Sequence, residues 1–230
     1  MNRDHETRPV QVPGAGACAT TFSNPVSADA VWRRLAVVLF LIAASAAAAA
    51  LPQLHELLLY DRGAIARGQV WRLFTGHLAH WSASHLAWNL VSLGAVGWGA
   101  RDLPFRLVSR PVSWSILLIG PVLFLCQAGM AQYTGLSGVV TALFVCLAGE
   151  RMRSAPDERW VWGALLVAMC GKIAVEFAQP TPLFAASGAP SFRASPMAHL
   201  VGAVVGWFAL APPRRLSLRA PLESARHVPS

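Results

Sequence analysis

Long runs without a charged side chain dominate the chain, and short segments that carry arginine separate them. Most of these runs are about long enough to cross the hydrocarbon core of a bilayer as a helix. The pattern predicts an all-α membrane protein with six spanning helices, at 35–51, 85–100, 112–128, 136–149, 160–177 and 196–210. The fourth run would cover only about 21 Å of a core roughly 30 Å thick, so we expect its N-terminus to begin inside the membrane.

The polar segments outside these runs complete the predicted organisation. We interpret residues 1–31 as a flexible N-terminal tail, 32–212 as the membrane domain and 213–230 as a basic tail. Residues 52–84 form a long loop whose amphipathic, aromatic stretch is suited to the membrane interface. The first run could instead belong to a secretory signal peptide, because the small residues at its end offer a cleavage site. The long lead-in and the later runs favour a retained anchor.

Composition supports a membrane protein and argues against several other classes. Hydrophobic residues make up 55% of the chain and charged residues 13%, whereas soluble domains carry about 25% charged residues. The net charge is +8, yet all but one of the 19 basic residues are arginines, mostly in loops and tails. They indicate topology rather than a nucleic-acid partner. The four cysteines show no CxxC spacing, so we expect no disulfide framework, metal or cofactor.

The distribution of arginine predicts the orientation of the helices. If the N-terminus is cytoplasmic, 14 arginines fall in cytoplasmic segments and 4 in outer loops. Arginine and lysine concentrate on the cytoplasmic side of membrane proteins. We therefore expect both termini in the cytoplasm.

Polar side chains within the apolar runs are candidates for function, because burying them in a bilayer is costly. His85 and Asn89 open the second run, Ser137 opens the fourth and His199 opens the sixth. These three runs have the same predicted direction, so their first turns should share one depth near the outer leaflet. Ser137 and His199 would then form a nucleophile–base pair.

The neighbouring residues are suited to stabilising an oxyanion. His85 and Asn89 are four residues apart, on one helix face, and can donate hydrogen bonds. Gly135 and Gly138 would let a substrate carbonyl approach the backbone at the start of the fourth helix, where N–H groups are spare. We find no aspartate or glutamate placed to complete a triad, so the pattern predicts a Ser–His dyad.

Each of these features also has a structural explanation. Small residues around Ser137 are common where membrane helices pack closely. A single buried histidine more often makes a structural hydrogen bond than acts as a base. Their combination at one predicted depth favours catalysis.

The ordered set of motifs resembles the rhomboid intramembrane serine proteases. It consists of Trp71-Arg72, His80, His85-x-x-x-Asn89, Gly135-x-Ser137-Gly138 and Ala198-His199-x-x-Gly202. The resemblance covers about residues 53–210 and implies a six-helix rhomboid-like bundle. It implies that Ser137 is the nucleophile and His199 the base. The oxyanion hole would comprise His85, Asn89, Ser137 and Gly135.

The same resemblance implies structural roles for other residues. His80 matches a loop histidine, and Trp71-Arg72 matches a dipeptide of the membrane-embedded first loop. Gly138 adjoins the serine. Gly202 and Gly206 match the small face on which the last helix packs against the serine helix.

A narrower resemblance is to the rhombosortase branch, and it rests on the compact chain, the sequence of residues 76–89 and the pair Lys172/Glu176. That branch is thought to process bacterial proteins that end in a Gly-Gly, transmembrane-helix and basic-tail signal. It implies single-pass membrane protein substrates and a bacterial inner-membrane enzyme whose site faces the periplasm.

Lys172 and Glu176 are four residues apart on one face of the fifth run, near the predicted depth of the site. They could form a structural ion pair that lowers the cost of two membrane charges. We favour a role in substrate recognition or in hydrating the site. The loop 178–195 could cover the site as a mobile cap or be a plain connector.

Two other functions remain to be weighed against a protease. A catalytically inactive, client-binding relative is possible, although Ser137 and His199 argue against it. A small transporter is disfavoured, because the chain shows no repeat and its polar residues cluster at one depth. The sequence leaves open whether water or an amine would complete the reaction.

Overall fold

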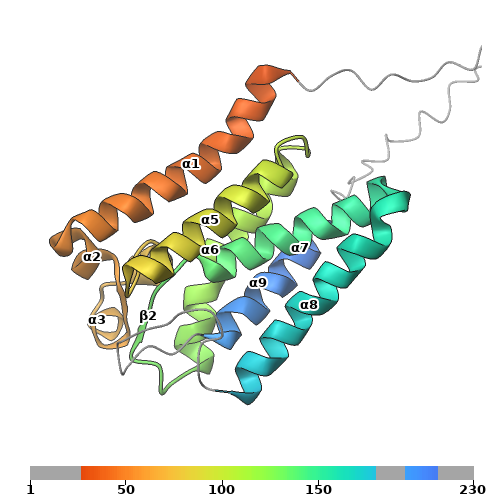
Figure 1. Cartoon of the computed structure of the whole chain (residues 1–230). Helices are drawn as coiled ribbons and strands as arrows, with labels where there is room; N and C mark the ends of the chain where they lie inside the picture. The colour runs from red at the N-terminus through yellow and green to blue at the C-terminus, as the bar shows by residue number, and fades with distance from the viewer. Residues whose placement is uncertain (1–26, 180–194, 212–230) are drawn as a thin grey trace, which may run out of the picture.

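A computed structural model describes residues 27–179 and 195–211, which are mainly helical (Figure 1). The helices are α1 (Ala28–Ala50), α2 (Pro52–Leu58), α3 (Arg62–Ala66), α4 (Arg72–Thr75), α5 (Ala83–Gly99), α6 (Arg106–Cys126), α7 (Ser137–Ser154), α8 (Arg159–Ala178) and α9 (Pro196–Ala209). A 3-10 turn at Pro156–Glu158 precedes α8, and the strands β1 (Tyr60–Asp61) and β2 (Gln132–Tyr133) form one antiparallel pair.

Each of the six predicted runs coincides with one of the long helices. Within the part of the chain that the structure describes, three segments are long and apolar enough to cross a membrane: α1, α6 and the segment Pro156–Ala178 that contains α8. The apolar helix α9 is shorter. Six crossings with both termini in the cytoplasm stay a prediction.

The first helix begins earlier than the sequence pattern predicted. Ser27 is its N-cap and accepts a hydrogen bond from the Ala30 amide, and Asp29 lies in the first turn, where a negative charge favours a helix. Residues 28–31 are therefore helical, and the predicted tail 1–31 is too long at that end. The remainder of that tail, residues 1–26, lies outside the described residues, as do the predicted basic tail and most of the loop 178–195.

The serine-bearing helix α7 lies at the centre of the bundle. Figure 1 shows α1 on one side of the molecule and α8 on the other, with α7 and α9 between them. Eleven residues of α7 are buried, among them Val139, Leu143 and Cys146. The core of the fold therefore surrounds this helix.

Helices α7 and α9 approach closely because glycines line their contact. A Cβ atom at Gly202 would overlap the Gly138 carbonyl, and one at Gly206 would overlap the Ala142 carbonyl. A Cβ at Gly138 would lie 2.8 Å from the carbonyl oxygen of Ala198. Small residues let the backbones of membrane helices pack directly against one another in this way.

We expect Gly202→Ala to destabilise the protein by about 1–3 kcal/mol, because the added methyl meets backbone that no rotamer change can relieve. Thermal unfolding in detergent would show this as a lower Tm. Gly94→Ala on α5 is the matched control, because nothing lies within 4 Å of its Cβ position. Equal Tm values for the two variants would contradict the expectation.

Arginine side chains tie one end of the bundle together. Arg151 donates to the Gly99 carbonyl at 2.8 Å and to Asp102 at 2.6 Å, and Arg153 donates to the Leu210 carbonyl at 3.2 Å. The C-terminal ends of α5, α7 and α9 therefore lie together, and the three helices run in the same direction. Their N-terminal ends meet at the opposite end of the bundle.

The segment 52–84, predicted to be a loop, contains the short helices α2, α3 and α4 and the strand β1. Arg72 donates through Nη1 to the carbonyls of Glu56 and Leu59, and Trp71 Nε1 donates to the Leu57 carbonyl. A Cβ at Gly120 would overlap the Leu73 carbonyl, so α4 lies directly against α6. These contacts fix the segment that carries Trp71-Arg72 to the end of the bundle where α5, α7 and α9 begin.

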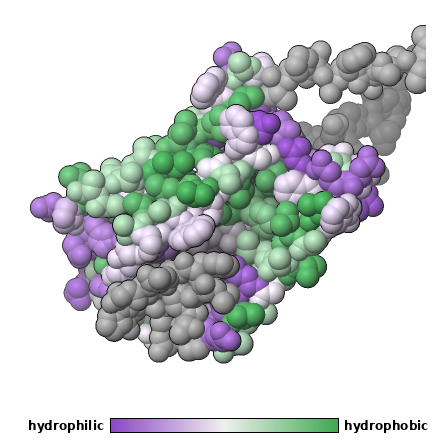
Figure 2. All heavy atoms as spheres, viewed as in Figure 1, coloured by the Kyte–Doolittle hydropathy of each residue, from purple (hydrophilic) through white to green (hydrophobic). Residues whose placement is uncertain are grey.

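Large apolar side chains are exposed along the long helices. Phe40 is 69% exposed, Trp160 76% and Leu125 78%. Figure 2 shows hydrophobic residues across the middle of the visible face and hydrophilic residues toward its two ends. Soluble monomers rarely expose apolar patches larger than a few hundred Å², so this surface is suited to lipid.

Candidate active site

Capping serines position two of the candidate site elements. Ser82 is the N-cap of α5 and accepts a hydrogen bond from the His85 amide at 3.1 Å. Ser195 is the N-cap of α9 and accepts one from the Ala198 amide, while its hydroxyl donates to Gln127 at 3.4 Å. Each cap fixes where its helix begins and thereby the position of the histidine in or next to its first turn.

The backbone leading into Ser137 is held against the side chains of α5. Gly135 has a φ of +109°, in the left-handed region that favours glycine. A Cβ there would lie 2.8 Å from His85 Nε2 and 3.6 Å from Asn89 Nδ2. The Tyr133 hydroxyl donates to the Gly135 carbonyl at 2.9 Å. The structure thus brings His85 and Asn89 to the segment just before Ser137.

Asn89 has a fixed orientation at this point. It is buried, and its Nδ2 donates to the His85 carbonyl at 2.9 Å. An amide nitrogen carries two hydrogens, so one can still be donated to another group. The side-chain amide is therefore arranged as a donor beside Gly135.

Ser137 and His199 lie at the start of adjoining helices. Gly138, next to Ser137, packs against the carbonyl of Ala198, next to His199. Ser137 is the first residue of α7, and its carbonyl accepts a hydrogen bond from Thr141 at 2.8 Å. The α7–α9 contact thus brings together the two helix starts that carry the predicted nucleophile and base.

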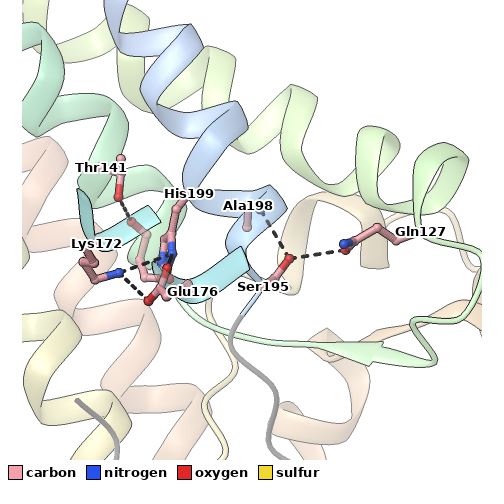
Figure 3. A network of polar contacts seen from close by, with 8 residues as sticks. Gln127, Thr141, Lys172, Glu176, Ser195, Ala198 and His199 are labelled. Atoms are coloured by element: carbon pink, nitrogen blue, oxygen red, sulfur yellow. Dashed lines mark hydrogen bonds and ion pairs between the residues drawn. The ribbon is translucent and has the colours of Figure 1, made fainter. Parts of the chain in front are cut away.

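His199 is buried and is in direct contact with an acidic side chain. Its Nδ1 lies 2.6 Å from one oxygen of Glu176, whose other oxygen lies 2.6 Å from Lys172 Nζ. Lys172 Nζ is 3.4 Å from the same ring nitrogen. His199 is 4% exposed and Glu176 6%. Figure 3 shows the three side chains pointing toward one another, Lys172 and Glu176 from α8 and His199 from α9.

The expectation that no acidic residue reaches the histidine is wrong. Sequence periodicity does not give the rotation of α8 about its axis, and that rotation decides whether Glu176 faces lipid or the start of α9. The available signal was the lysine–glutamate pair within an otherwise apolar run. A role of the pair in substrate recognition or hydration stays a prediction.

Two further histidines pack beside the site as neutral rings. His80 Nδ1 lies 3.1 Å from the Leu78 carbonyl, and its ring is 5.1 Å from that of His85. Burial, and then His85, lower the pKa of His80 to about 3. His77, which the sequence analysis did not single out, packs on Tyr133, and burial lowers its pKa to about 4. At neutral pH both therefore contribute packing rather than charge.

The remaining residues that the sequence analysis singled out lie next to the candidate site or in contacts between helices. Trp71 and Arg72 bond to the carbonyls of α2 and its C-terminal end, as described above. Gly202 and Gly206 lie in the α7–α9 contact. Among residues 27–179 and 195–211, no group of three or more His, Cys, Asp or Glu side chains could hold a metal ion.

Comparison with known proteins identifies one related family. The family model described as Rhomboid domain matches residues 67–213, which is more than half of the chain. The match includes the helix starts that carry His85, Ser137 and His199, as well as Lys172 and Glu176. A search of curated proteins finds no match to the chain.

Proposed function

We propose that this chain, which belongs to the rhomboid family, is an active intramembrane serine protease. Rhomboid proteins are intramembrane serine proteases that act on membrane protein substrates within the bilayer, and the apolar helices agree with an integral membrane protein. In our proposal Ser137 is the nucleophile and His199 the general base. The substrates are membrane-anchored proteins whose peptide bonds the enzyme hydrolyses.

The observation that carries the proposal is the meeting of three helix starts around Gly135 and Ser137. His85 and Asn89 from α5 adjoin Gly135, and the first turn of α9 packs on Gly138. A nucleophile, a base and hydrogen-bond donors are the parts that acyl transfer needs. Here they come from segments more than 40 residues apart in the chain.

The reaction follows from the chemistry of these groups. Ser137 Oγ attacks the substrate carbonyl while His199 Nε2 takes its proton, and the carbonyl electron pair becomes an oxyanion. His85, Asn89 and the backbone N–H of Ser137 donate hydrogen bonds to that oxyanion. The C–N bond then breaks, and the leaving amine receives the proton from His199. Water, deprotonated by His199, then attacks the acyl carbonyl, the ester C–O bond breaks, and His199 returns the proton to Ser137 Oγ.

The substrate requires a locally extended segment, because a helical peptide bond keeps its carbonyl engaged. We propose that the enzyme is rhombosortase-like and removes a C-terminal Gly-Gly, transmembrane and basic sorting signal from single-pass proteins. Glycine destabilises a helix by about 0.5–1 kcal/mol relative to alanine, so such a junction is suited to unwinding. The proposed setting is a bacterial inner membrane.

The arginines support the orientation of this proposal. Those that cap α5 and α9 lie at the end of the bundle opposite Ser137. If this end is cytoplasmic, as the distribution of arginine favours, the active site faces the periplasm. Single cysteines, Gly129→Cys or Ser154→Cys, in a cysteine-free background would test this orientation with a membrane-impermeant thiol reagent. The cysteine at position 129 should react from the periplasmic side only.

Labelling with a fluorophosphonate in native-like membranes tests the proposed function. An activated serine becomes phosphonylated, so we expect a mass shift on the peptide that contains Ser137. Labelling at another residue would remove Ser137 as the nucleophile. The absence of labelling in well-folded protein would favour the alternative function, a catalytically inactive rhomboid relative that binds membrane clients.

We expect Asn89→Ala to lower kcat by about 10²–10³-fold, because one donor to the oxyanion is lost. KM should change little, since the interaction strengthens only as negative charge develops. Cleavage of a reporter substrate in proteoliposomes measures both constants. Ser92→Ala, one turn farther along α5, is the matched control. A raised KM with unchanged kcat would instead assign Asn89 to substrate binding.

A further inference from the structure

We infer that Glu176 is a positioning residue for His199, so that the site is a Ser137–His199–Glu176 triad whose acidic member is held by Lys172. The inference rests on the proposed function, because it assigns a role within that reaction. It replaces the dyad predicted from the sequence. It also replaces the role of Glu176 in substrate recognition.

The contact between Glu176 and His199 sets the tautomer of the ring. An ionised carboxylate only accepts hydrogen bonds, so the 2.6 Å contact requires the proton of the neutral imidazole to lie on Nδ1. The lone pair is then on Nε2. This is the nitrogen that must take the proton from Ser137 Oγ, as in serine protease triads on other folds.

The same contact stabilises the charge that forms during the reaction. When Nε2 accepts the serine proton, the ring becomes an imidazolium with the Glu176 carboxylate directly on its other nitrogen. Both side chains are almost fully buried, so water screens this attraction little. No proton passes to Glu176, which stays ionised throughout.

Lys172 makes a buried carboxylate tolerable at this depth. A carboxylate without a partner is costly to bury, and Lys172 Nζ lies 2.6 Å from the oxygen that does not face His199. The lysine side chain is 26% exposed, so its ammonium also reaches a more polar surrounding. With one oxygen on each partner, the carboxyl plane is fixed and Glu176 is directed at the histidine.

Stabilisation of α8 alone does not explain the pair. In helices the order with glutamate four residues before lysine is the more favourable one, and here the lysine comes first. A plain ion pair would not require His199, yet the imidazole occupies one of the two carboxylate oxygens. A substrate would have to displace one of these partners to reach Glu176.

The experiment compares variants of the full chain in proteoliposomes with a reporter substrate. We expect Glu176→Leu with Lys172→Met to lower kcat about 10³-fold with KM unchanged, because the tautomer is no longer fixed. This double variant carries neither charge, so it should fold even if an unpaired lysine prevents Glu176→Leu from doing so. Glu176→Gln removes the charge and places an amide that can donate to Nδ1, which holds the ring proton on Nε2, so we expect a loss at least as large. Glu158→Gln, at the other end of α8, is the matched control.

A double-mutant comparison tests whether Lys172 acts through Glu176. Lys172→Met alone should lower kcat, because the carboxylate loses its fixed orientation. In the Glu176→Gln background the same substitution should have a much smaller effect, since no carboxylate remains to be held. Equal effects in both backgrounds would show that Lys172 acts independently and would overturn its assignment.

Nuclear magnetic resonance of ¹⁵N-labelled histidine reports the tautomer of the His199 ring. A Lys172–Glu176 pair with a purely structural role would not affect that tautomer. We expect the neutral His199 ring to carry its proton on Nδ1 in the wild type and to shift toward Nε2–H in the variant without both charges. His199→Gln identifies the signals among the seven histidines of the chain. An unchanged tautomer would overturn the inference.

The outcomes separate the inference from the proposed function. An inactive wild type that also fails to react with fluorophosphonate overturns both. An active wild type together with full kcat in the variant lacking both charges overturns the triad and leaves a Ser–His protease. A raised KM with unchanged kcat assigns the pair to substrate recognition instead.

Discussion

Ser137→Ala is expected to lower the rate of substrate cleavage about 10⁶-fold, since removing the nucleophile of a serine protease leaves only binding and oxyanion stabilisation. Substrate binding should persist, because the hydroxyl contributes to bond formation rather than to holding the substrate. Stability should also be retained. The hydrogen bond from Thr141 within α7 goes to the carbonyl of Ser137, which the substitution leaves in place.

Single-turnover cleavage of a reporter substrate in proteoliposomes would measure this loss. Ser154→Ala is the matched control, because that serine lies on the same helix and its hydroxyl donates only to the carbonyl of Glu150 in its own helix. We also expect the Ser137→Ala variant to resist fluorophosphonate. Cleavage at the wild-type rate would mean that another residue attacks the substrate.

The six long helices were readily predicted from the sequence, whereas their ends and the short helices α2, α3 and α4 were not. Charge-free runs mark where a helix can lie in lipid, and each predicted run coincides with a long helix. The ends depend on local contacts. With Ser27 as its N-cap, α1 begins at Ala28, seven residues before the predicted start. Helix α7 continues past Gly149 to Ser154, and its arginines cap neighbouring helices there. The hydrophobic pattern contains no information about such contacts.

That the candidate site residues lie at one end of the bundle could be inferred from the predicted topology. Three runs with one direction place their first turns at one end, and the helix starts of α5, α7 and α9 do lie together. The pairing of Tyr60 with Tyr133 was not predicted, because two-residue strands have no recognisable period. This pairing holds the approach to Gly135, so part of the support for the site was invisible in the sequence.

The partner of His199 was missed for a different reason. Glu176 lies on α8 near the end of the bundle where α9 begins, but a helix can direct such a side chain to any side. The packing of α8 against α7 and α9 selects the side that faces the histidine. Where an acidic residue and a histidine lie near the same end of two apolar helices, contact between their side chains is the first hypothesis to test.

His199→Ala is expected to lower cleavage by about 10⁵–10⁶-fold, almost as much as the loss of Ser137, because a serine hydroxyl without a base is a poor nucleophile. The two residues act as one unit, so the double variant should be no slower than either single variant. KM should be unchanged, since the imidazole acts on the proton and not on the bound substrate.

The His199→Ala background also decides how Glu176 acts. If the carboxylate works only through the imidazole, adding Glu176→Gln to His199→Ala should cause no further loss of cleavage. His55→Ala, a histidine of α2, is the matched control and should cleave at the wild-type rate. A further loss in the double variant would require Glu176 to contact substrate or water directly. Retained cleavage by His199→Ala itself would mean that another group acts as the base. The proposed Ser137–His199–Glu176 triad would then be wrong.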